Sequence, residues 1–171
     1  LRQNSLLDHT LMGLAMTGIA LPAFVSAPIL ALFFGLYLKL LPVAGWNGGA
    51  LPNSAWSATG NWASGAAPGN GSVQSLAFGG SINPNPANDV ANLTAVELTF
   101  APDAGSFTLS GNALILGGDI ANNSVNEQTL DLPLTLASGY WFFKAVAGDL
   151  KAVNVISGTG SPVKSGPHLL T

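Results

Sequence analysis

Leu130-Asp131-Leu132-Pro133-Leu134-Thr135-Leu136 is the stretch that decides how the second half of this chain folds. Leucine occupies every even-numbered position, and polar residues or proline lie between the leucines. Strict alternation of apolar and polar side chains is typical of a β-strand that buries one of its faces. Pro133 lies on the opposite face, and because proline has no N–H, it requires an edge or a bulge there. The stretch therefore predicts a half-buried strand with its leucines in a core.

Shorter runs of the same kind surround this stretch, and small polar segments separate them. Many short strands with such turns leave a sandwich, a barrel and a parallel β-solenoid open as folds. Asn-Gly corners and the scarcity of charge favour the solenoid, because stacked coils place like side chains against each other. The runs contain Val96, Leu98 and Phe100; Phe107 and Leu109; Leu114 and Leu116; Trp141 and Phe143; and Val153 and Val155, and the predicted turns include Ser110-Gly111-Asn112, Gly117-Gly118-Asp119 and Ser157-Gly158.

The composition of the 171 residues differs from that of an ordinary soluble domain. Charged residues make up 8% of the chain, against about 25% in a typical globular protein. The net charge is −3 with five Lys and Arg residues, so no basic patch is available to bind nucleic acid. The chain has no cysteine, which excludes disulfides, thiolate nucleophiles and sulfur ligands for metals.

A long uncharged run, residues 10–38, precedes the β-type sequence, with His9 before it and Lys39 after it. A helix through the whole run would span about 43 Å, more than the roughly 30 Å of a bilayer's hydrocarbon core. Pro22 and Pro28 disfavour a straight helix. A secretory signal peptide is the alternative, but its apolar region has only about 7–15 residues. We therefore predict a transmembrane helix that is kinked at proline and has the lipid bilayer as its partner.

Small residues recur at four-residue spacing inside this predicted helix. Small side chains on one helical face let another transmembrane helix approach closely. The alternative is that the spacing has no role in helix packing, because alanine and glycine are common in such helices. The residues are Ala23, Ala27, Ala31 and Gly35.

Residues 1–53 resemble the B-type permease subunit of bacterial oligopeptide and dipeptide ABC importers. The resemblance rests on Leu1-Arg2-Gln3-Asn4, Ala15-Met16-Thr17-Gly18, Pro22-Ala23-Phe24-Val25 and Gly45-Trp46-Asn47-Gly48-Gly49-Ala50-Leu51. It implies a cytoplasmic start, one helix of the permease across the inner membrane at residues 10–41, and an external loop with Trp46 at the membrane interface. It covers a small part of such a subunit and no ATPase-coupling loop, so we expect the fragment by itself to transport nothing.

Residues 56–171 resemble the autotransporter-associated β-strand repeat proteins of bacterial surfaces. The matching tracts include Ala67-Pro68-Gly69-Asn70-Gly71, Phe107-Thr108-Leu109-Ser110-Gly111-Asn112 and Ile156-Ser157-Gly158-Thr159-Gly160. The resemblance implies a right-handed parallel β-helix that acts as a stalk or passenger, with no enzymatic activity and no cofactor. Together with the permease resemblance, it implies a periplasmic or extracellular location for this part of the chain.

No group of residues predicts a catalytic, cofactor-binding or metal site. The two histidines, His9 and His168, lie in different parts of the chain, and a metal or general base needs convergent partners. Gly117-Gly118-Asp119 resembles a calcium-binding repeat but lacks its third glycine and a tandem copy. Trp56 and Trp62 could stack on a sugar, although aromatic residues at the start of a solenoid more often close the end of its core.

The sequence therefore predicts a mixed chain with a boundary after Ser54: residues 1–54 form a transmembrane segment and external loop, and residues 55–171 form an all-β solenoid. Three hypotheses for function follow. The first is a non-enzymatic, membrane-anchored surface protein that self-associates through the open ends of its solenoid. The second is a fragment of a peptide-importer permease with an unrelated tail. The third is a chimera produced by gene rearrangement or sequence assembly, without a function of its own.

Overall fold

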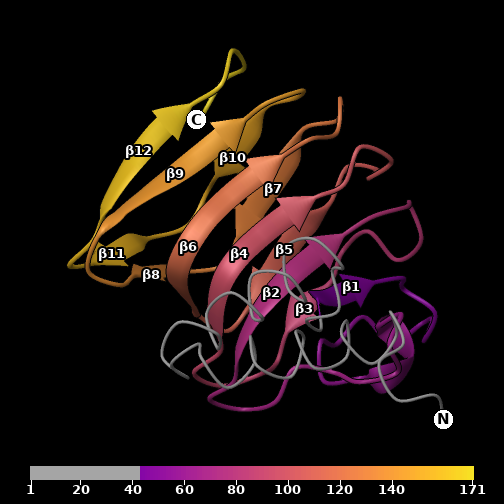
Figure 1. Ribbon diagram of the computed structural model, residues 1–171. Helices are drawn as coiled ribbons and strands as arrows, with labels where there is room; N and C mark the ends of the chain where they lie inside the picture. Colours follow the sequence, from indigo (N-terminus) through magenta and orange to yellow (C-terminus); the bar gives the residue numbers. More distant parts are fainter. Residues whose placement is uncertain (1–42) are drawn as a thin grey trace, which may run out of the picture. The chain divides into compact units, whose positions relative to one another are not determined.

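The computed structural model describes residues 43–171, which form two parallel β-sheets and one short 3-10 helix, η2 (Thr59–Asn61) (Figure 1). The eight-stranded sheet contains β1 (Val43–Trp46), β2 (Val73–Phe78), β4 (Thr94–Phe100), β6 (Leu114–Asn122), β8 (Leu134–Leu136), β9 (Tyr140–Ala145), β11 (Ile156–Gly158) and β12 (Ser161–Ser165). The four-stranded sheet contains β3 (Ala87–Asn88), β5 (Thr108–Gly111), β7 (Gln128–Asp131) and β10 (Leu150–Ala152).

The strand register shows a parallel solenoid. Every pairing between named strands is parallel, and each strand pairs with one from the next turn of the chain: Val73 with Thr94, and Leu114 with Leu134. The chain thus returns to the same position after about 20 residues, and the stacked turns bury a continuous core. We number these turns as coils one to six: residues 43–72, 73–93, 94–113, 114–133, 134–155 and 156–171.

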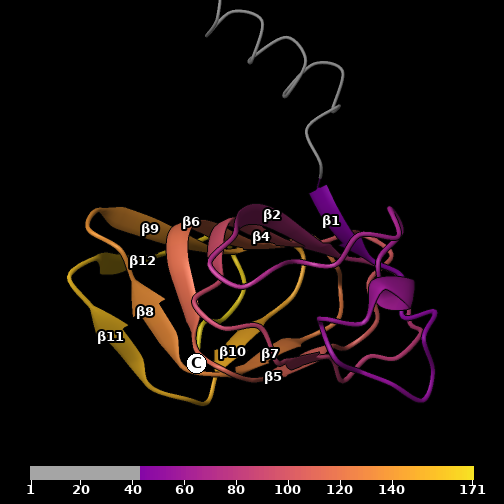
Figure 2. The same cartoon turned by 90° about the horizontal axis from the view of Figure 1, so that it is seen from below.

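The eight-stranded sheet bends around β6, so the coils enclose their core from several sides. The first residues of β6 pair with β8, and its last residues pair with β9. In Figure 2, β9 and β6 lie on the side opposite β7 and β5, and β8 and β11 connect the two sides. The side chains that point between these sides form the core.

The even-numbered leucines of 130–136 are all buried, as the sequence predicts. They do not lie on one strand, however: β7 ends at Asp131, β8 begins at Leu134, and the two strands belong to different sheets. The leucines extend columns of apolar side chains that pass from coil to coil. Leu114 stacks on Leu134, and Leu109 stacks on Leu130. The all-β, solenoid-like architecture is thereby confirmed for residues 73–165. Within residues 43–171, no helix is long and apolar enough to cross a membrane, and the helix predicted for residues 10–41, with its small-residue stripe, lies outside the described residues.

Two details of the strands differ from the prediction. Val96 does not share the buried face of Leu98 and Phe100: its side chain is 43% exposed, whereas Ala95 is buried. A bulge between Ala95 and Glu97 shifts the register and reverses the alternation at that point. Two predicted turns are strand instead: Gly117-Gly118-Asp119 is the middle of β6, and Ser110-Gly111 ends β5. Gly118 lies against this bulge, and a Cβ there would come within 1.7 Å of the Val96 carbonyl oxygen.

Two predictions for the C-terminal part of the chain also differ from the structure. Val153 and Val155 alternate, yet both are exposed. Ser157-Gly158 belongs to strand β11 instead of a turn. Alternation marks which side chains share a face, but it does not say which of the two faces is covered.

The described fold includes residues from both sides of the boundary that the sequence predicts after Ser54. Strand β1 pairs with β2, so Val43 aligns with Ser75 and Trp46 with Phe78. The compact unit that contains the solenoid includes all of residues 43–54. Residues 43–54, which the sequence assigns to an external loop, are thus part of coil one.

Candidate functional site

The described residues contain no group of three His, Asp or Glu side chains that could hold a metal ion. His168 lies beside Asp149, with 3.7 Å between Nδ1 and Oδ1, and the same carboxylate accepts a hydrogen bond from the Leu169 N–H. Asp119 lies on the outer face of β6, where it forms an ion pair with Lys144 at 2.7 Å and accepts the Phe142 N–H. These carboxylates hold neighbouring coils together. His9 lies outside the described residues.

Two aspartates have a pKa below the ordinary value, and in both the cause is local hydrogen bonding. For Asp119, partial burial raises the pKa, but the hydrogen bond from Lys144, the Phe142 N–H and the Lys144 charge together outweigh it. For Asp89, burial again raises the pKa, and hydrogen bonds from the side chain and backbone of Ser57 outweigh it. A lowered pKa keeps both groups ionised, which suits a structural role and does not suit a general acid near neutral pH.

The N-terminal end of the core is closed by a cluster of aromatic rings. Trp46, Trp56 and Trp62 are all buried there. Trp46 meets Trp62 edge to face, with 5.3 Å between ring centroids, and Phe78 packs 6.0 Å from Trp46 and 5.6 Å from Trp56. Phe100 continues the stack below Phe78 at 5.7 Å. We call Trp46, Trp56, Trp62 and Phe78 the aromatic cap.

Hydrogen bonds fix the aromatic cap to the loop that follows β1. The Trp62 indole N–H donates to the Trp56 carbonyl at 2.6 Å, and that of Trp46 donates to the Asn83 carbonyl at 3.3 Å. Asn61 is buried and uses its whole amide: it accepts the Ala50 N–H and donates to the carbonyls of Asn53 and Ala55. Because these partners lie on both sides of position 54, the loop and the solenoid form one hydrogen-bonded structure.

Residues 43–54, the external loop of the permease resemblance, therefore have a different environment from the one that the sequence predicts. Trp46 is expected at a membrane interface, where tryptophan places its ring at headgroup depth. In the structure its side chain is 4% exposed and lies inside the aromatic cap. Trp56 and Trp62 are buried with it, so neither offers a flat surface on which a sugar could stack.

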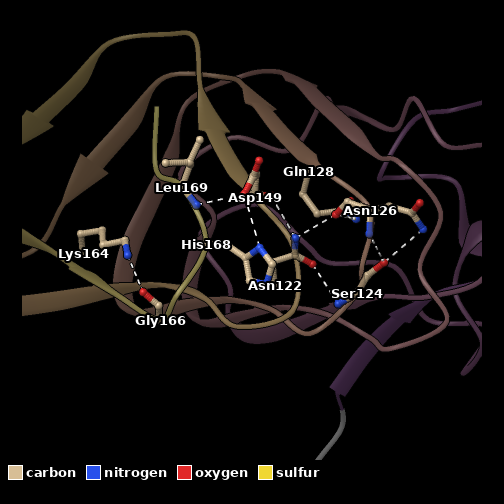
Figure 3. Close-up of polar contacts among 9 residues, drawn as sticks. All are labelled: Asn122, Ser124, Asn126, Gln128, Asp149, Lys164, Gly166, His168 and Leu169. Carbon is tan, nitrogen blue, oxygen red and sulfur yellow. Dashed lines mark hydrogen bonds and ion pairs between the residues drawn. The ribbon is translucent and has the colours of Figure 1, made fainter.

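A cluster of polar side chains fills a corner of coil four (Figure 3). Asn122 occupies the core column that holds Phe100 in the coil before it. Its amide donates to the carbonyls of Asn126 and Asp149 and accepts the Ser124 N–H. Gln128 bridges coils through the Phe107 N–H and the Gly105 carbonyl. A buried amide stabilises one conformation of the chain when its hydrogen bonds are made, as they are at this corner.

Sequence reasoning missed the buried roles of Asn61, Asn122 and Gln128. The signal for the asparagines is weak, because an asparagine at a strand end is equally typical of an exposed turn. The aromatic run 140–143 contains core and surface residues: Phe143 is buried, Trp141 packs against the core, and Tyr140 and Phe142 are exposed.

Comparison with known proteins finds similarity to peptide permeases in one segment of the chain. The segment is 57% identical over 51 residues to the oligopeptide transport system permease protein OppB of Escherichia coli (strain K12), which is 30% of this chain and 17% of that protein. The OppB of Salmonella typhimurium is 55% identical over 51 residues, and the dipeptide transport system permease protein DppB of Bacillus subtilis is 46% identical over 46 residues.

The chain spans about a sixth of the length of these curated relatives. No protein-family model and no solved structure matches the chain. The permease resemblance is thus confirmed for one segment, and the resemblance to autotransporter-associated repeats stays a prediction.

Proposed function

We propose that this chain joins a segment of a peptide-importer permease to a non-enzymatic structural β-solenoid. The 57% identity over 51 residues to OppB supports the first part and is the observation that carries the proposal. The length of the match agrees with the stretch 1–53 that resembles the permease. In this proposal, residues 10–41 lie in the bacterial inner membrane and contact other permease helices through the stripe Ala23, Ala27, Ala31 and Gly35.

The structural role of the solenoid rests on how its polar groups are used. Asp119, Asp149 and the buried amide of Asn122 are all engaged between coils. A fold whose polar side chains hold its own coils together is suited to act as a rigid spacer or passenger. We place it outside the inner membrane, because the permease resemblance gives the end of the helix an external position.

Transport by the chain itself is tested by complementation. A bacterial strain that lacks OppB and carries the gene for these 171 residues should fail to take up a peptide on which its growth depends. The intact OppB gene in the same vector is the matched control. Restored peptide uptake would show that the chain is a working permease and would contradict the structural role.

Topology is tested by a reporter. Alkaline phosphatase fused after Thr171 folds and works outside the inner membrane, so it should be active in a bacterial host. A β-galactosidase fusion at the same position is the matched control and should be inactive. The opposite pair of results would place the solenoid in the cytoplasm and overturn the proposed location.

An accidental join of two genes is a second candidate, and one observation favours it: the permease resemblance stops near the point where the repeat-like sequence begins. Long DNA reads from independent isolates across the codons for residues 50–60 would separate the two. An unbroken reading frame in every isolate is the result expected for a real fusion. A junction that is absent from the genome would mean that the chain has no function.

A further inference from the structure

Asparagine is followed by glycine at two places in the chain, Asn47-Gly48 and Asn70-Gly71. This pair of residues is chemically reactive, because glycine has no Cβ and its backbone nitrogen can approach the Cγ of the asparagine side chain. Attack at that carbon closes a succinimide ring. Both pairs lie in coil one, and both glycines have a positive φ, 65° at Gly48 and 70° at Gly71. Their surroundings differ, and this difference separates the two sites.

A single residue of coil two, Ala91, holds both reacting groups of Asn70-Gly71. The Ala91 N–H donates a hydrogen bond to the Asn70 Oδ1 at 2.9 Å, and the Ala91 carbonyl accepts the Gly71 N–H at 2.9 Å. The side-chain amide and the nitrogen that would attack it are thus held side by side, and such positioning lowers the entropic part of a reaction barrier. The Ala91 N–H also points at the oxygen on which negative charge develops during the attack.

The surroundings of Asn70-Gly71 leave room for this reaction. Asn70, Gly71 and Ala91 are all exposed. A Cβ added to Gly71 would meet no atom within 4 Å. The ring can therefore form without displacing a neighbour, and the water that must open it has free access.

The loop at Asn47-Gly48 is packed on several sides instead. Gly48 is buried, and a Cβ there would come within 2.3 Å of the Ile82 carbonyl oxygen. The Asn61 carbonyl accepts the N–H groups of Asn47 at 2.8 Å and Gly48 at 3.3 Å, and the Asn47 Oδ1 accepts the Gly49 N–H at 3.0 Å. Ring closure rotates the backbone between asparagine and glycine, and these contacts oppose that rotation.

We propose that Asn70-Gly71 is a site of spontaneous covalent modification, at which the asparagine becomes aspartate or isoaspartate. A base removes the Gly71 N–H proton, and the nitrogen forms a bond to the Asn70 Cγ. The bond between Cγ and the side-chain nitrogen then breaks, and this nitrogen takes up a proton and leaves as ammonia. Water adds to one of the two ring carbonyls and breaks one ring C–N bond, so water is the co-reactant and no redox step is involved.

The modification changes the surface and the backbone of coil one. Either product adds one negative charge to a chain whose net charge is −3. Isoaspartate also adds a methylene to the main chain just before Ser72, whose carbonyl accepts the Thr94 N–H at 2.9 Å. This goes beyond the proposed structural function, because the site makes the solenoid a protein whose charge and backbone change with age.

Incubation of the full chain in detergent micelles at mildly alkaline pH tests the proposal, with mass spectrometry of its proteolytic peptides as the readout. Asn47 is the internal control, because glycine follows it too. In guanidinium chloride that unfolds the solenoid, the two asparagines should react at similar rates. In the folded chain, Asn70 should react at least as fast as in denaturant, and Asn47 about tenfold more slowly than Asn70. Both aspartate and isoaspartate should form at position 70.

The variant Ala91→Pro tests the positioning residue, because proline keeps the carbonyl but has no N–H. It should slow the reaction of Asn70 in the folded chain and leave that of Asn47 unchanged. If this variant loses its β-type circular dichroism, the parent's rates in the folded and unfolded states decide. Equal rates at the two asparagines of the folded parent, aspartate without isoaspartate, or a folded Ala91→Pro with an unchanged Asn70 rate would each overturn the proposal.

Discussion

Replacing Trp46 with alanine is expected to destabilise the solenoid strongly. The Trp46 ring packs against Trp62 and Phe78, and its N–H donates to the Asn83 carbonyl. Truncating a buried tryptophan to alanine costs about 3–5 kcal/mol. We take the lower end of this range, about 3 kcal/mol. For a domain of this size, that corresponds to a fall of roughly 10 °C in melting temperature.

The measurement is thermal unfolding of the full chain in detergent micelles, followed by the β-type circular dichroism signal. Tyr140→Ala is the control, because this aromatic side chain is 74% exposed and its loss should change stability by no more than about 0.5 kcal/mol. If Trp46→Ala melts within about 2 °C of the parent, Trp46 is not in the core. A tryptophan that only touched lipid headgroups would give that result.

Three further predictions concern the coils and their ion pairs. Leu134→Asp should unfold the solenoid because it buries an unpaired charge at a cost of several kcal/mol, whereas Asp131→Asn, at an exposed position, should melt like the parent in the same circular dichroism assay. Gly118→Ala should lower the free energy of unfolding by about 1–3 kcal/mol, because its Cβ meets the Val96 carbonyl; urea titration measures this, and parent-like unfolding would contradict the bulge. The Asp119 pKa is lowered in the folded state, so its contribution is present above the unfolded pKa of about 3.9 and is lost as pH falls through the folded value. Asp119→Asn should therefore flatten the acid loss of stability, and melts between pH 2 and 6 that keep the parent's slope would refute this.

The parts of the fold that follow from sequence are those set by local alternation. The leucines of 130–136 are buried as predicted, although the predicted single strand is divided into β7 and β8, which belong to different sheets. The alternation places Val96 on the wrong face, because its exposure depends on a bulge that lies against Gly118 in the next coil. Contacts between residues so far apart in the chain leave no mark on the local pattern.

Trp46 shows a second limit of sequence reasoning. Its surroundings, Gly45-Trp46-Asn47-Gly48-Gly49, are typical of a turn-rich loop and resemble a permease. Whether the ring faces lipid or packs on Phe78 depends on which strand pairs with β1, and the sequence does not show that partner. The burial of Asn122 likewise depends on partners that the sequence does not show: the carbonyls of Asn126 and Asp149, which accept its hydrogen bonds.

The central claim is that residues 43–54 are part of the solenoid and close its N-terminal end. Urea unfolding of two chains, residues 43–171 and residues 55–171, tests it most directly. The longer chain should unfold in one cooperative transition, with tryptophan fluorescence that reports a buried aromatic cap. The shorter chain lacks β1, so Leu76 and Phe78 lose the residues that pair with them, Ala44 and Trp46. It should therefore unfold at much lower urea or have no transition. Equal midpoints for the two chains would contradict the claim.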